Sequence, residues 1–379
     1  MIFSLQEFSE TLEDVETTYL THAIHPYPAK FPPKIPRKIL EKFSAPGKLV
    51  LDPFCGSGTT LVEARLLGVN SVGIDINGLA CLLSKVKATP INEQQIQMIH
   101  NVIEKFKEIS FKWNMGSRKN KVKFNFKGIG HWFQDNVCEE LTLIQLEINE
   151  IKEKVVQDFF RISFSSIIVR VSNQDSDTRF AAINKNVEDG FTINYFLKKS
   201  KDYLKRLVDF SKLAKANCTV DVVNADTRNL NFLMSDSIDI IITSPPYANT
   251  YDYYLYHKFR KRWLGIDVEF AQYNEIGSRR EFSSLKQEPT KWLEDLKICF
   301  SQMHRVLKKD SFAFIVIGDS VIKKQIIRMD EAIKGFSSQV GLVVEHVVSS
   351  DLSNHSKIFN PLFAQKGKKE HLIIMRKKS

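Results

Sequence analysis

Apolar and polar residues follow two different periods along the first part of the chain. The apolar run KLVLDPF at 48–54 leads through a glycine turn into TTLVEARLLG at 59–68. This order predicts a strand, a tight loop and a helix that ends at Gly68. SVGIDIN at 71–77 and GLACLLSKVKAT at 78–89 repeat it. Strands that alternate with helices predict a mostly parallel sheet in a doubly wound α/β fold.

Residues 90–216 interrupt this alternation. They are predicted to form long helices separated by basic and polar stretches, with one helix breaking at the polar run 172–178. The stretch 111–130 has no acidic residue but contains Lys112, Arg118, Lys119, Lys121, Lys123 and Lys127. We therefore expect residues 1–89 and 217–379 to form one α/β core, with 90–216 as a helical insertion.

The sheet is predicted to resume after the insertion. Further apolar runs predict strands at 218–226, 237–247, 311–319, 341–350 and 371–377. The last two are expected to be an antiparallel pair at an edge of the sheet. An amphipathic helix is predicted over 290–309, with apolar positions at Trp292, Leu293, Leu296, Phe300, Met303 and Leu307. Residues 267–289 are expected to be a polar loop.

Composition narrows the class of protein. Of 379 residues, 43% are apolar, which is enough for a sizeable core. The net charge of +10 favours a polyanionic partner. No apolar stretch reaches the ~20 residues of a membrane helix, and the N-terminus lacks the basic start of a secretory signal. We therefore expect a cytoplasmic protein with no membrane contact. The five scattered cysteines indicate reduced thiols, and no metal is expected.

The segment DPFCGSGTT at 52–60 lies where the first predicted strand meets its helix. Glycines there let the backbone approach a ligand, and the amides at a helix start favour a carboxylate or phosphate. The spacing is neither that of dinucleotide binders nor that of the P-loop. Asp75 and Asp226 end two further predicted strands, so three carboxylates are expected along one sheet edge. Together these features predict a nucleotide-like cofactor, whereas the glycines alone also fit a tight turn.

The segment TSPPY at 243–247 follows a strongly apolar strand. Pro245 and Pro246 stiffen the loop and lack N–H donors, so its carbonyls remain available as acceptors. An exocyclic base amine is a poor nucleophile because its lone pair is delocalised into the ring. If the Ser244 hydroxyl and the Pro245 carbonyl accepted its hydrogens, that lone pair would be directed toward a methyl donor. Tyr247 offers a flat ring for a base turned out of a duplex.

Together the two segments resemble the amino-group DNA methyltransferases, whose FxGxG motif is matched by Phe54, Gly56 and Gly58. The resemblance implies a Rossmann-like methyltransferase sheet and S-adenosyl-L-methionine as cofactor. It also implies transfer of a methyl group to an exocyclic amine of a base in double-stranded DNA. A cognate restriction endonuclease would be the partner, in a prokaryotic cytoplasm close to the nucleoid. The oligomeric state stays open between monomer and homodimer.

The same resemblance implies roles for individual residues. Residues 53–58 would wrap the methionine part of the cofactor, and the Pro-rich segment 25–40 would close over it. The alternative for 25–40 is an extended segment that packs against the sheet. Asp75 would hold the ribose hydroxyls, and Asp226 would accept from the adenine amino group. The residues expected to bind the cofactor are Tyr27, Asp52, Pro53, Phe54, Cys55, Gly56, Gly58, Thr59, Thr60, Asp75, Ile76 and Asp226. The residues expected to be catalytic are Ser244, Pro245, Pro246 and Tyr247.

The target base is open between two amines. SPPY is similar to the cytosine-N4 subgroup, so cytosine N4 is preferred and adenine N6 is the alternative. Methylation at carbon 5 needs a cysteine nucleophile, usually after proline, and Cys55 instead lies in the cofactor loop. An RNA base-amino methyltransferase and a catalytically inactive DNA-binding relative are the remaining alternatives. The cofactor loop precedes the catalytic loop, the reverse of the order in many cytosine-N4 enzymes.

Three segments are candidates for DNA contact. In the first, aromatic and cationic residues are interleaved, namely Tyr251, Tyr253, Tyr254, Tyr256 and Trp263 with His257, Lys258, Arg260, Lys261 and Arg262. The alternative for this segment is an amphipathic helix with about half of its aromatic residues in the core. The second lies in 90–216 and contains Arg170, Asn173, Gln174, Asp175 and Arg179. These side chains suit base reading, and equally a helix cap with internal ion pairs. The third is the loop 272–287 with Arg279 and Arg280.

Overall fold

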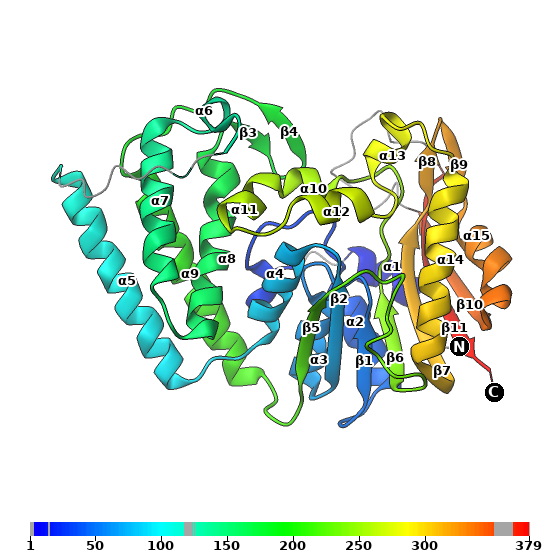
Figure 1. Ribbon diagram of the computed structural model, residues 1–379. Coiled ribbons are helices and arrows are strands. Elements are labelled where there is room, and N and C mark those ends of the chain that lie inside the picture. The colour runs from blue at the N-terminus through cyan, green and yellow to red at the C-terminus, as the bar shows by residue number, and fades with distance from the viewer. Residues whose placement is uncertain (1–3, 14–15, 117–123, 125, 352–366, 379) are drawn as a thin grey trace.

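The computed structural model describes residues 4–13, 16–116, 124, 126–351 and 367–378. Within them one central sheet contains β1 (Leu49–Asp52), β2 (Asn70–Asp75), β5 (Val220–Asn224), β6 (Ile238–Thr243), β7 (Leu307–Gly318), β10 (Leu342–Asp351) and β11 (Lys369–Lys377), as Figure 1 shows. Their order across the sheet is β5-β2-β1-β6-β7-β11-β10. The chain thus proceeds from β1 to β5 in one direction and returns to β6 on the other side of β1.

The strands β5, β2, β1, β6 and β7 are mutually parallel, whereas β11 runs antiparallel to both of its neighbours, β7 and β10. In this register Leu51 of β1 lies opposite Val72 of β2 and Ile241 of β6. The doubly wound, mostly parallel α/β fold is therefore confirmed, and so is the antiparallel pair at one edge. The change of direction between β1 and β6 marks the place where open α/β sheets bind ligands.

Helices cover both faces of the sheet and fill the segment between β2 and β5. In chain order they are α1 (Leu5–Glu13), α2 (Lys34–Phe43), α3 (Thr59–Leu67), α4 (Gly78–Ala88), α5 (Glu93–Asn114), α6 (Ile129–Trp132), α7 (Asp135–Asn149), α8 (Lys154–Val171), α9 (Phe191–Leu213), α10 (Tyr253–Tyr256), α11 (Lys258–Trp263), α12 (Glu269–Asn274), α13 (Arg279–Ser283), α14 (Pro289–Val306) and α15 (Met329–Ser337). The smaller elements are the 3-10 turns η1 (Leu20–Ala23) and η2 (Ser338–Val340), and the hairpins β3 (Gln174–Ser176) with β4 (Arg179–Ala182) and β8 (Ser320–Ile322) with β9 (Gln325–Ile327).

Alternate strand residues point to opposite faces of the sheet. Leu51, Ile241 and Ile315 are buried in the cluster formed with α14 and α15. Val50 and Phe314 belong to the cluster on the other face, formed with α1 and α2. Both faces are thus sealed by apolar contacts, and the loops at the strand ends are left to carry polar chemistry.

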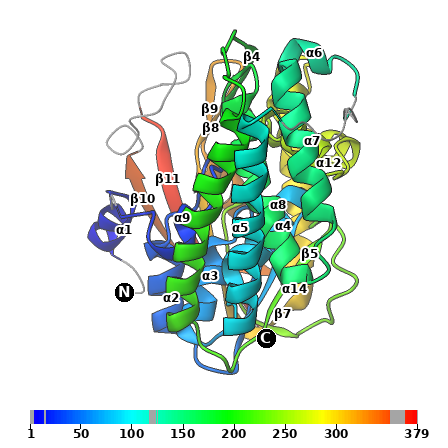
Figure 2. The same cartoon turned by 90° about the vertical axis from the view of Figure 1, so that its left-hand side faces the viewer.

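The helical segment between α4 and β5 packs directly onto the α/β core. Figure 2 shows α5 and α9 at the front of this layer, with α7 and α8 beside them. Phe106 of α5, Phe160 of α8 and Phe196 of α9 are fully buried together with Leu61 of α3 and Leu83 of α4. The ring centroids of Phe106 and Phe196 are 4.8 Å apart. The layer therefore shares one apolar core with the helices that flank the glycine loop.

Local signals place several boundaries where the sequence predicts them. The helix α3 ends before Gly68, and α8 ends at the start of the polar run, with Ser172 as its cap. A reciprocal pair of hydrogen bonds between Asn92 and Gln95 begins α5. Two expectations are wrong. The predicted polar loop 267–289 contains α12 and α13, and Leu307 begins β7 and does not belong to the preceding helix.

The basic residues Arg118, Lys119, Lys121 and Lys123 lie outside the described residues. None of the described helices combines the length and the apolar character needed to cross a membrane.

Candidate active site

The loops after β1, β2, β5 and β6 lie at the carboxyl edge of the sheet, toward the top of Figure 1. Asp52 and Asp75 are the last residues of β1 and β2, and Ser244 directly follows β6. Asp226 lies two residues beyond the end of β5. Because these strands are consecutive in the sheet, the structure brings the three predicted acids and the predicted catalytic loop to one edge.

The glycine loop is tightly fitted between β2 and α4. Gly58 has a φ of +81°, and a Cβ there would lie 2.8 Å from the backbone of Ser84. A larger residue is excluded at this position both by backbone conformation and by space. Cys55 is buried, and its amide donates to the Ile74 carbonyl at 2.9 Å. The loop therefore holds its shape through the main chain.

The Asp75 carboxylate connects the glycine loop to the end of β2. It accepts hydrogen bonds from the backbone amides of Gly56 at 2.9 Å and Asn77 at 2.8 Å. Burial raises the pKa of Asp75 to about 6, although both hydrogen bonds lower it. A carboxylate has about four acceptor sites, so lone pairs remain for further donors such as hydroxyl groups.

The Asp52 carboxylate connects the glycine loop to β6. It accepts from the Thr243 hydroxyl at 2.7 Å and from the Phe54 amide at 3.2 Å. Burial raises the pKa of Asp52 to about 6, with these hydrogen bonds acting in the opposite direction. Thr243 immediately precedes Ser244, so the two predicted loops are joined by a direct side-chain contact.

The other predicted cofactor residues surround this contact. The Pro53 carbonyl accepts the hydroxyl of Thr227, a residue that the sequence did not suggest. Thr59 and Thr60 are buried in the first turn of α3, and Ile76 is half-buried after β2. Phe54 is half-buried and packs against the apolar cluster under α14.

Tyr27 lies over the glycine loop. Its ring is the nearest group to an added Cβ on Gly56, at 3.6 Å. It stacks on His257 with ring centroids 5.0 Å apart and on Tyr253 at 5.9 Å. The sequence suggested His257 and Tyr253 only as DNA contacts, yet the structure places both beside the predicted cofactor loop.

The protonation of His257 follows from its neighbour. The Arg260 guanidinium, which can only donate, lies 3.3 Å from Nδ1 of His257, so Nδ1 accepts. Burial lowers the pKa of His257 well below its ordinary value, and the proton of the neutral ring is therefore on Nε2. That nitrogen is buried without a hydrogen-bond partner in the described part of the chain. A buried donor left unsatisfied beside Tyr27 suits a polar ligand.

Asp226 is held by an arginine that the sequence did not single out. Arg228 contacts both carboxylate oxygens of Asp226, at distances from 2.6 to 3.1 Å. It also donates to Asp295 of α14 at 2.9 Å and to the Asn274 carbonyl at 3.1 Å. The predicted adenine-binding acid is thus ion-paired, and Arg228 ties its position to α12 and α14.

The catalytic loop carries a short series of hydroxyl contacts. The Ser244 hydroxyl donates to the phenolic oxygen of Tyr247 at 3.4 Å, and the Tyr247 hydroxyl donates to Glu370 of β11. Burial raises the pKa of Glu370 to about 7. Pro245 is buried, and Pro246 is half-buried. Glu370 was missed because nothing in its local sequence distinguishes it from an edge-strand charge.

Two further ionisable groups are buried nearby. Glu275 accepts the backbone amides of Tyr253 and Tyr254 at 2.9 and 3.2 Å, and burial raises its pKa to about 8. Lys261 is 1% exposed, and burial lowers its pKa although Asp75 and Glu275 raise it. The edge of the sheet therefore concentrates ionisable groups in a region of low dielectric constant, as active sites do.

Comparison with known proteins identifies the family to which this chain belongs. The family model for DNA methylases matches residues 5–86 and 238–377. The chain belongs to the DNA methylase family. It is 24% identical to the Type II methyltransferase M.MvaI of Kocuria varians over 368 residues, which cover 84% of this chain and 81% of that protein. It is 25% identical to the Type II methyltransferase M.MjaII of Methanocaldococcus jannaschii, covering 82% of this chain and 74% of that protein.

The cofactor of this DNA methylase is S-adenosyl-L-methionine, and the residues at the sheet edge fit it. The glycine loop leaves its backbone open toward Tyr27, where a Cβ at Gly56 would lie 3.6 Å from the ring. The Asp75 carboxylate has acceptor sites left for the ribose, and the unpaired Nε2 of His257 is a buried donor. Asp52 and Asp75 would supply negative charge toward a sulfonium bound at this edge.

The first candidate for DNA contact in this methylase is mostly buried. Tyr254, Tyr256 and Trp263 are less than 10% exposed, and Arg260 and His257 are fully buried. Arg260 donates to the Ser165 carbonyl of α8 at 3.1 Å and pairs with Asp177 in the β3–β4 hairpin. The expectation of a DNA surface is therefore wrong for most of this segment, which instead joins the catalytic loop to the helical layer.

The residues considered for base reading in the helical segment have partners within the protein. The side chain of Asn173 donates to the His131 carbonyl at 3.1 Å, and the side-chain amide of Gln174 donates to the Ser176 carbonyl at 2.8 Å. Asp175 pairs with Arg179. These contacts agree with the alternative of a helix cap with internal ion pairs. Arg170, by contrast, is exposed at the end of α8.

The α12–α13 segment lies against the catalytic loop. The Gly277 carbonyl accepts the Asn249 amide at 2.9 Å. Tyr273 is 72% exposed, and the Arg280 guanidinium lies 5.7 Å from the centre of its ring. An exposed ring with a cation beside it, next to the catalytic loop, is suited to contact nucleic acid.

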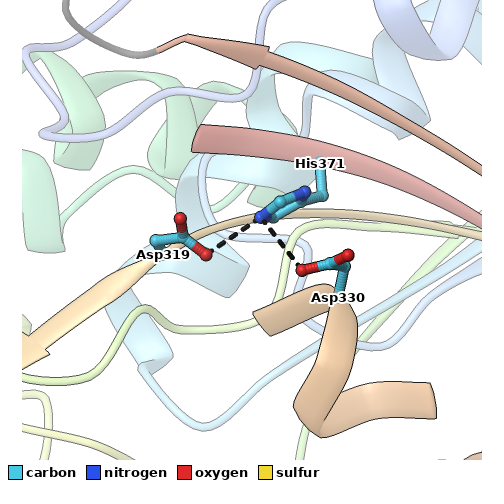
Figure 3. Close-up of side chains that lie close together, drawn as sticks. All are labelled: Asp319, Asp330 and His371. Atoms are coloured by element: carbon cyan, nitrogen blue, oxygen red, sulfur yellow. Dashed lines mark hydrogen bonds and ion pairs between the residues drawn. The ribbon is translucent and has the colours of Figure 1, made fainter. Parts of the chain in front are cut away.

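A cluster of two acids and a histidine lies beyond Glu370, as Figure 3 shows. Nε2 of His371 contacts Asp319 at 2.9 Å and Asp330 at 3.8 Å. Both oxygens of Asp319 are already used, by His371 and the Met329 amide on one side and by Arg328 and the Lys369 amide on the other. Burial opposes ionisation of Asp319, but these contacts outweigh it and lower its pKa to about 2. The cluster is a hydrogen-bonded brace that fixes the start of β11 to β7.

Proposed function

We propose that this DNA methylase transfers the methyl group to N4 of cytosine in duplex DNA, in a base turned out of the helix. The main support is the position of Ser244, one residue beyond the Thr243 hydroxyl that is bonded to Asp52 of the cofactor loop. An acceptor at this place lies next to the loop that holds the methyl donor. SPPY is similar to the cytosine-N4 subgroup, and adenine N6 is the alternative.

The proposed roles follow from the chemistry of each group. The Ser244 hydroxyl and the Pro245 carbonyl accept the two amine hydrogens and direct the nitrogen lone pair. The ring of Tyr247 stacks on the extruded base. Asp75 accepts from the ribose hydroxyls, and Asp226, held by Arg228, accepts from the adenine amino group. When bound, S-adenosyl-L-methionine supplies an electrophilic methyl group.

Target recognition is proposed for two regions that flank this site. One is α12–α13 with exposed Tyr273 and half-buried Arg280, and the other is the helical insertion 90–216 with exposed Arg170. The net charge of +10 favours a polyanionic partner for the chain as a whole. The proposed partner is a restriction endonuclease that cuts the same sequence and is encoded in a separate chain.

The test is direct identification of the modified nucleoside. Unmethylated duplex DNA is incubated with the protein and S-adenosylmethionine, digested to nucleosides and analysed by mass spectrometry. N4-methylcytosine is expected, and Ser244→Ala should abolish it. N6-methyladenine alone would transfer the proposal to adenine. Methylation confined to a structured RNA substrate would contradict it, and absence of cofactor binding by calorimetry would indicate an inactive relative.

A further inference from the structure

A chain of hydroxyl groups leads from the catalytic loop to a buried carboxylate. Ser244 donates to Tyr247 at 3.4 Å, and Tyr247 donates to Glu370. Glu370 is 7% exposed and pairs across the sheet with Gly318, the last residue of β7. The carboxylate therefore lies at the same edge of the sheet as the catalytic loop, although it belongs to an antiparallel strand.

The direction of these hydrogen bonds follows from the groups themselves. A hydroxyl carries one hydrogen, and an ionised carboxylate only accepts. Tyr247 gives its hydrogen to Glu370 and can therefore only accept from Ser244. Because the hydrogen of Ser244 is directed to Tyr247, the lone pairs of its oxygen remain for an incoming amine. The Ser244–Tyr247 distance is long for an O–H···O bond, and such contacts shorten when a substrate is bound.

We infer that Glu370, acting through Tyr247, holds Ser244 as a hydrogen-bond acceptor for the target amine and receives the proton that this amine loses after methylation. The inference rests on the proposed function, because it needs an exocyclic amine as nucleophile, on either cytosine or adenine. Glu370 is a positioning residue here, since it reaches the reaction only through two hydroxyl groups.

Methyl transfer leaves the product nitrogen with one proton that must be removed. The nitrogen lone pair forms the N–C bond while the S–C bond breaks and leaves its electron pair on sulfur. The positive charge moves from sulfur to nitrogen. The nitrogen then gives a proton to Ser244, Ser244 gives its own to Tyr247, and Tyr247 gives its own to Glu370. The carboxylate becomes a neutral acid, and it returns the proton to solvent before the next turnover.

The surroundings of Glu370 suit a group that takes up a proton near neutral pH. The charged and titratable groups around it are Lys368, His371, Asp319, Tyr247 and Tyr251. Burial raises the pKa of Glu370 to about 7, although Tyr247, His371 and Lys368 lower it. Burial and the carboxylate raise the pKa of Tyr247 well above its ordinary value, so Tyr247 stays a neutral donor. The brace in Figure 3 fixes His371 and Asp319, and with them the strand that carries Glu370.

Two variants break the chain at different links. Tyr247→Phe keeps the ring for base stacking and removes both hydrogen bonds, whereas Glu370→Gln keeps the shape and removes the proton acceptor. Single-turnover methyl transfer is measured by rapid quench across the pH range ~5.5 to ~8.5. The rate of the unchanged protein should rise with an apparent pKa near 7. Each variant should be at least about tenfold slower, with dissociation constants for S-adenosylmethionine and DNA changed by less than about threefold.

The pH profile separates this role from a structural one. Glu370→Gln should lose the rise with pH, and Glu370→Asp should recover part of the rate and of the rise. Glu345→Gln, on the adjacent strand β10, is the matched control and should behave as the unchanged protein. Unchanged rate and pH profile in both Tyr247→Phe and Glu370→Gln would overturn the inference.

Two safeguards keep the outcomes distinct. Circular dichroism identifies a variant that does not fold, and Tyr247→Phe alone then decides, because it leaves the carboxylate and the ring in place. Nucleosides from the same reactions identify the methylated base. N6-methyladenine would contradict the cytosine proposal and still allow the inference, whereas N4-methylcytosine formed at full rate by both variants would overturn the inference alone.

Discussion

The hydroxyl of Thr243 donates a hydrogen bond of 2.7 Å to the carboxylate of Asp52. These are the last residues of β6 and β1, which are neighbours in the sheet. The bond therefore joins the catalytic loop to the glycine loop at the point where the chain reverses direction across the sheet. Asp52 is 2% exposed, and hydrogen bonds are strong in such a region of low dielectric constant.

Replacement of this hydroxyl by a methyl group, Thr243→Val, should uncouple the two loops. Asp52 loses a donor in a buried site, so the free energy of unfolding should fall by about 1–3 kcal/mol. The single-turnover rate should fall about tenfold, because a small misplacement of reacting groups slows transfer. Denaturant unfolding and rapid quench measure the two effects. Thr290→Val, at an exposed position in α14, is the control. Equal transfer rates in the two variants would disprove the coupling.

Gly58→Ala and Gly56→Ala, both in the cofactor loop, should differ in their effect on the free energy of unfolding, with Gly47→Ala as the reference. Gly47, with a φ of +88° and no atom within 4 Å of an added Cβ, measures the cost of positive φ alone. Gly58→Ala adds a contact of 2.8 Å with the Ser84 backbone, and the free energy of unfolding should fall by about 1–3 kcal/mol more than in Gly47→Ala. The added Cβ of Gly56→Ala meets the Tyr27 ring at 3.6 Å and the Phe54 carbonyl at 4.0 Å, which are ordinary contact distances, and this variant should be as stable as Gly47→Ala.

Cofactor binding completes that comparison. The methyl group of Gly56→Ala enters the space beside Tyr27, and the dissociation constant for S-adenosylmethionine should rise about tenfold or more, equivalent to at least ~1.4 kcal/mol. Isothermal titration calorimetry measures it, with Gly47→Ala as the reference. Unchanged affinity in Gly56→Ala would show that the cofactor does not lie against this part of the loop.

The acids at the strand ends could be placed from the sequence. Asp52 and Asp75 each end an apolar run that is followed by a helical pattern, and in a parallel sheet such ends share one edge. Local periodicity is sufficient for this, because it fixes strand, loop and helix over a few residues.

Contacts between distant segments could not be placed in the same way. Glu370 meets Tyr247 across 123 residues, and this pairing depends on β11 entering the sheet beside β7. The interleaved aromatic and cationic residues after the catalytic loop suggested a DNA surface, yet Arg260 is buried against Asp177, 83 residues away. Residue types alone cannot tell a solvated cation from one whose partner arrives from another part of the chain.

Cofactor binding should be linked to proton release near pH 6. Burial raises the pKa of Asp52 and of Asp75 to about 6. A sulfonium and ribose hydroxyls favour the ionised carboxylates and lower these pKa values, so affinity should increase from pH ~5 to pH ~7. The stability of the free protein depends on pH in the opposite direction. The raised pKa values stabilise the fold fully below pH ~4, and this contribution is lost as the pH rises through the folded-state value.

Calorimetry in two buffers of different ionisation enthalpy counts the released protons. Asp75→Asn should reduce the number and weaken binding, because the ribose loses its ionised acceptor. Asp310→Asn, whose side chain is 52% exposed at the opposite end of β7, is the control. Binding without proton release between pH ~5 and ~7 would mean that neither carboxylate changes its ionisation in the complex.

Arg280 should contact DNA, and the matched control is an arginine at the other edge of the sheet. Arg280 lies 5.7 Å from the Tyr273 ring, and Arg376 lies 5.6 Å from the Phe312 ring, but only the first pair adjoins the catalytic loop. Arg280→Ala should weaken binding of a duplex by about 1–2 kcal/mol and reduce the salt dependence by about one unit. Arg376→Ala should change neither. Fluorescence anisotropy at several salt concentrations measures both, and an effect confined to Arg170→Ala would transfer DNA contact to the helical insertion.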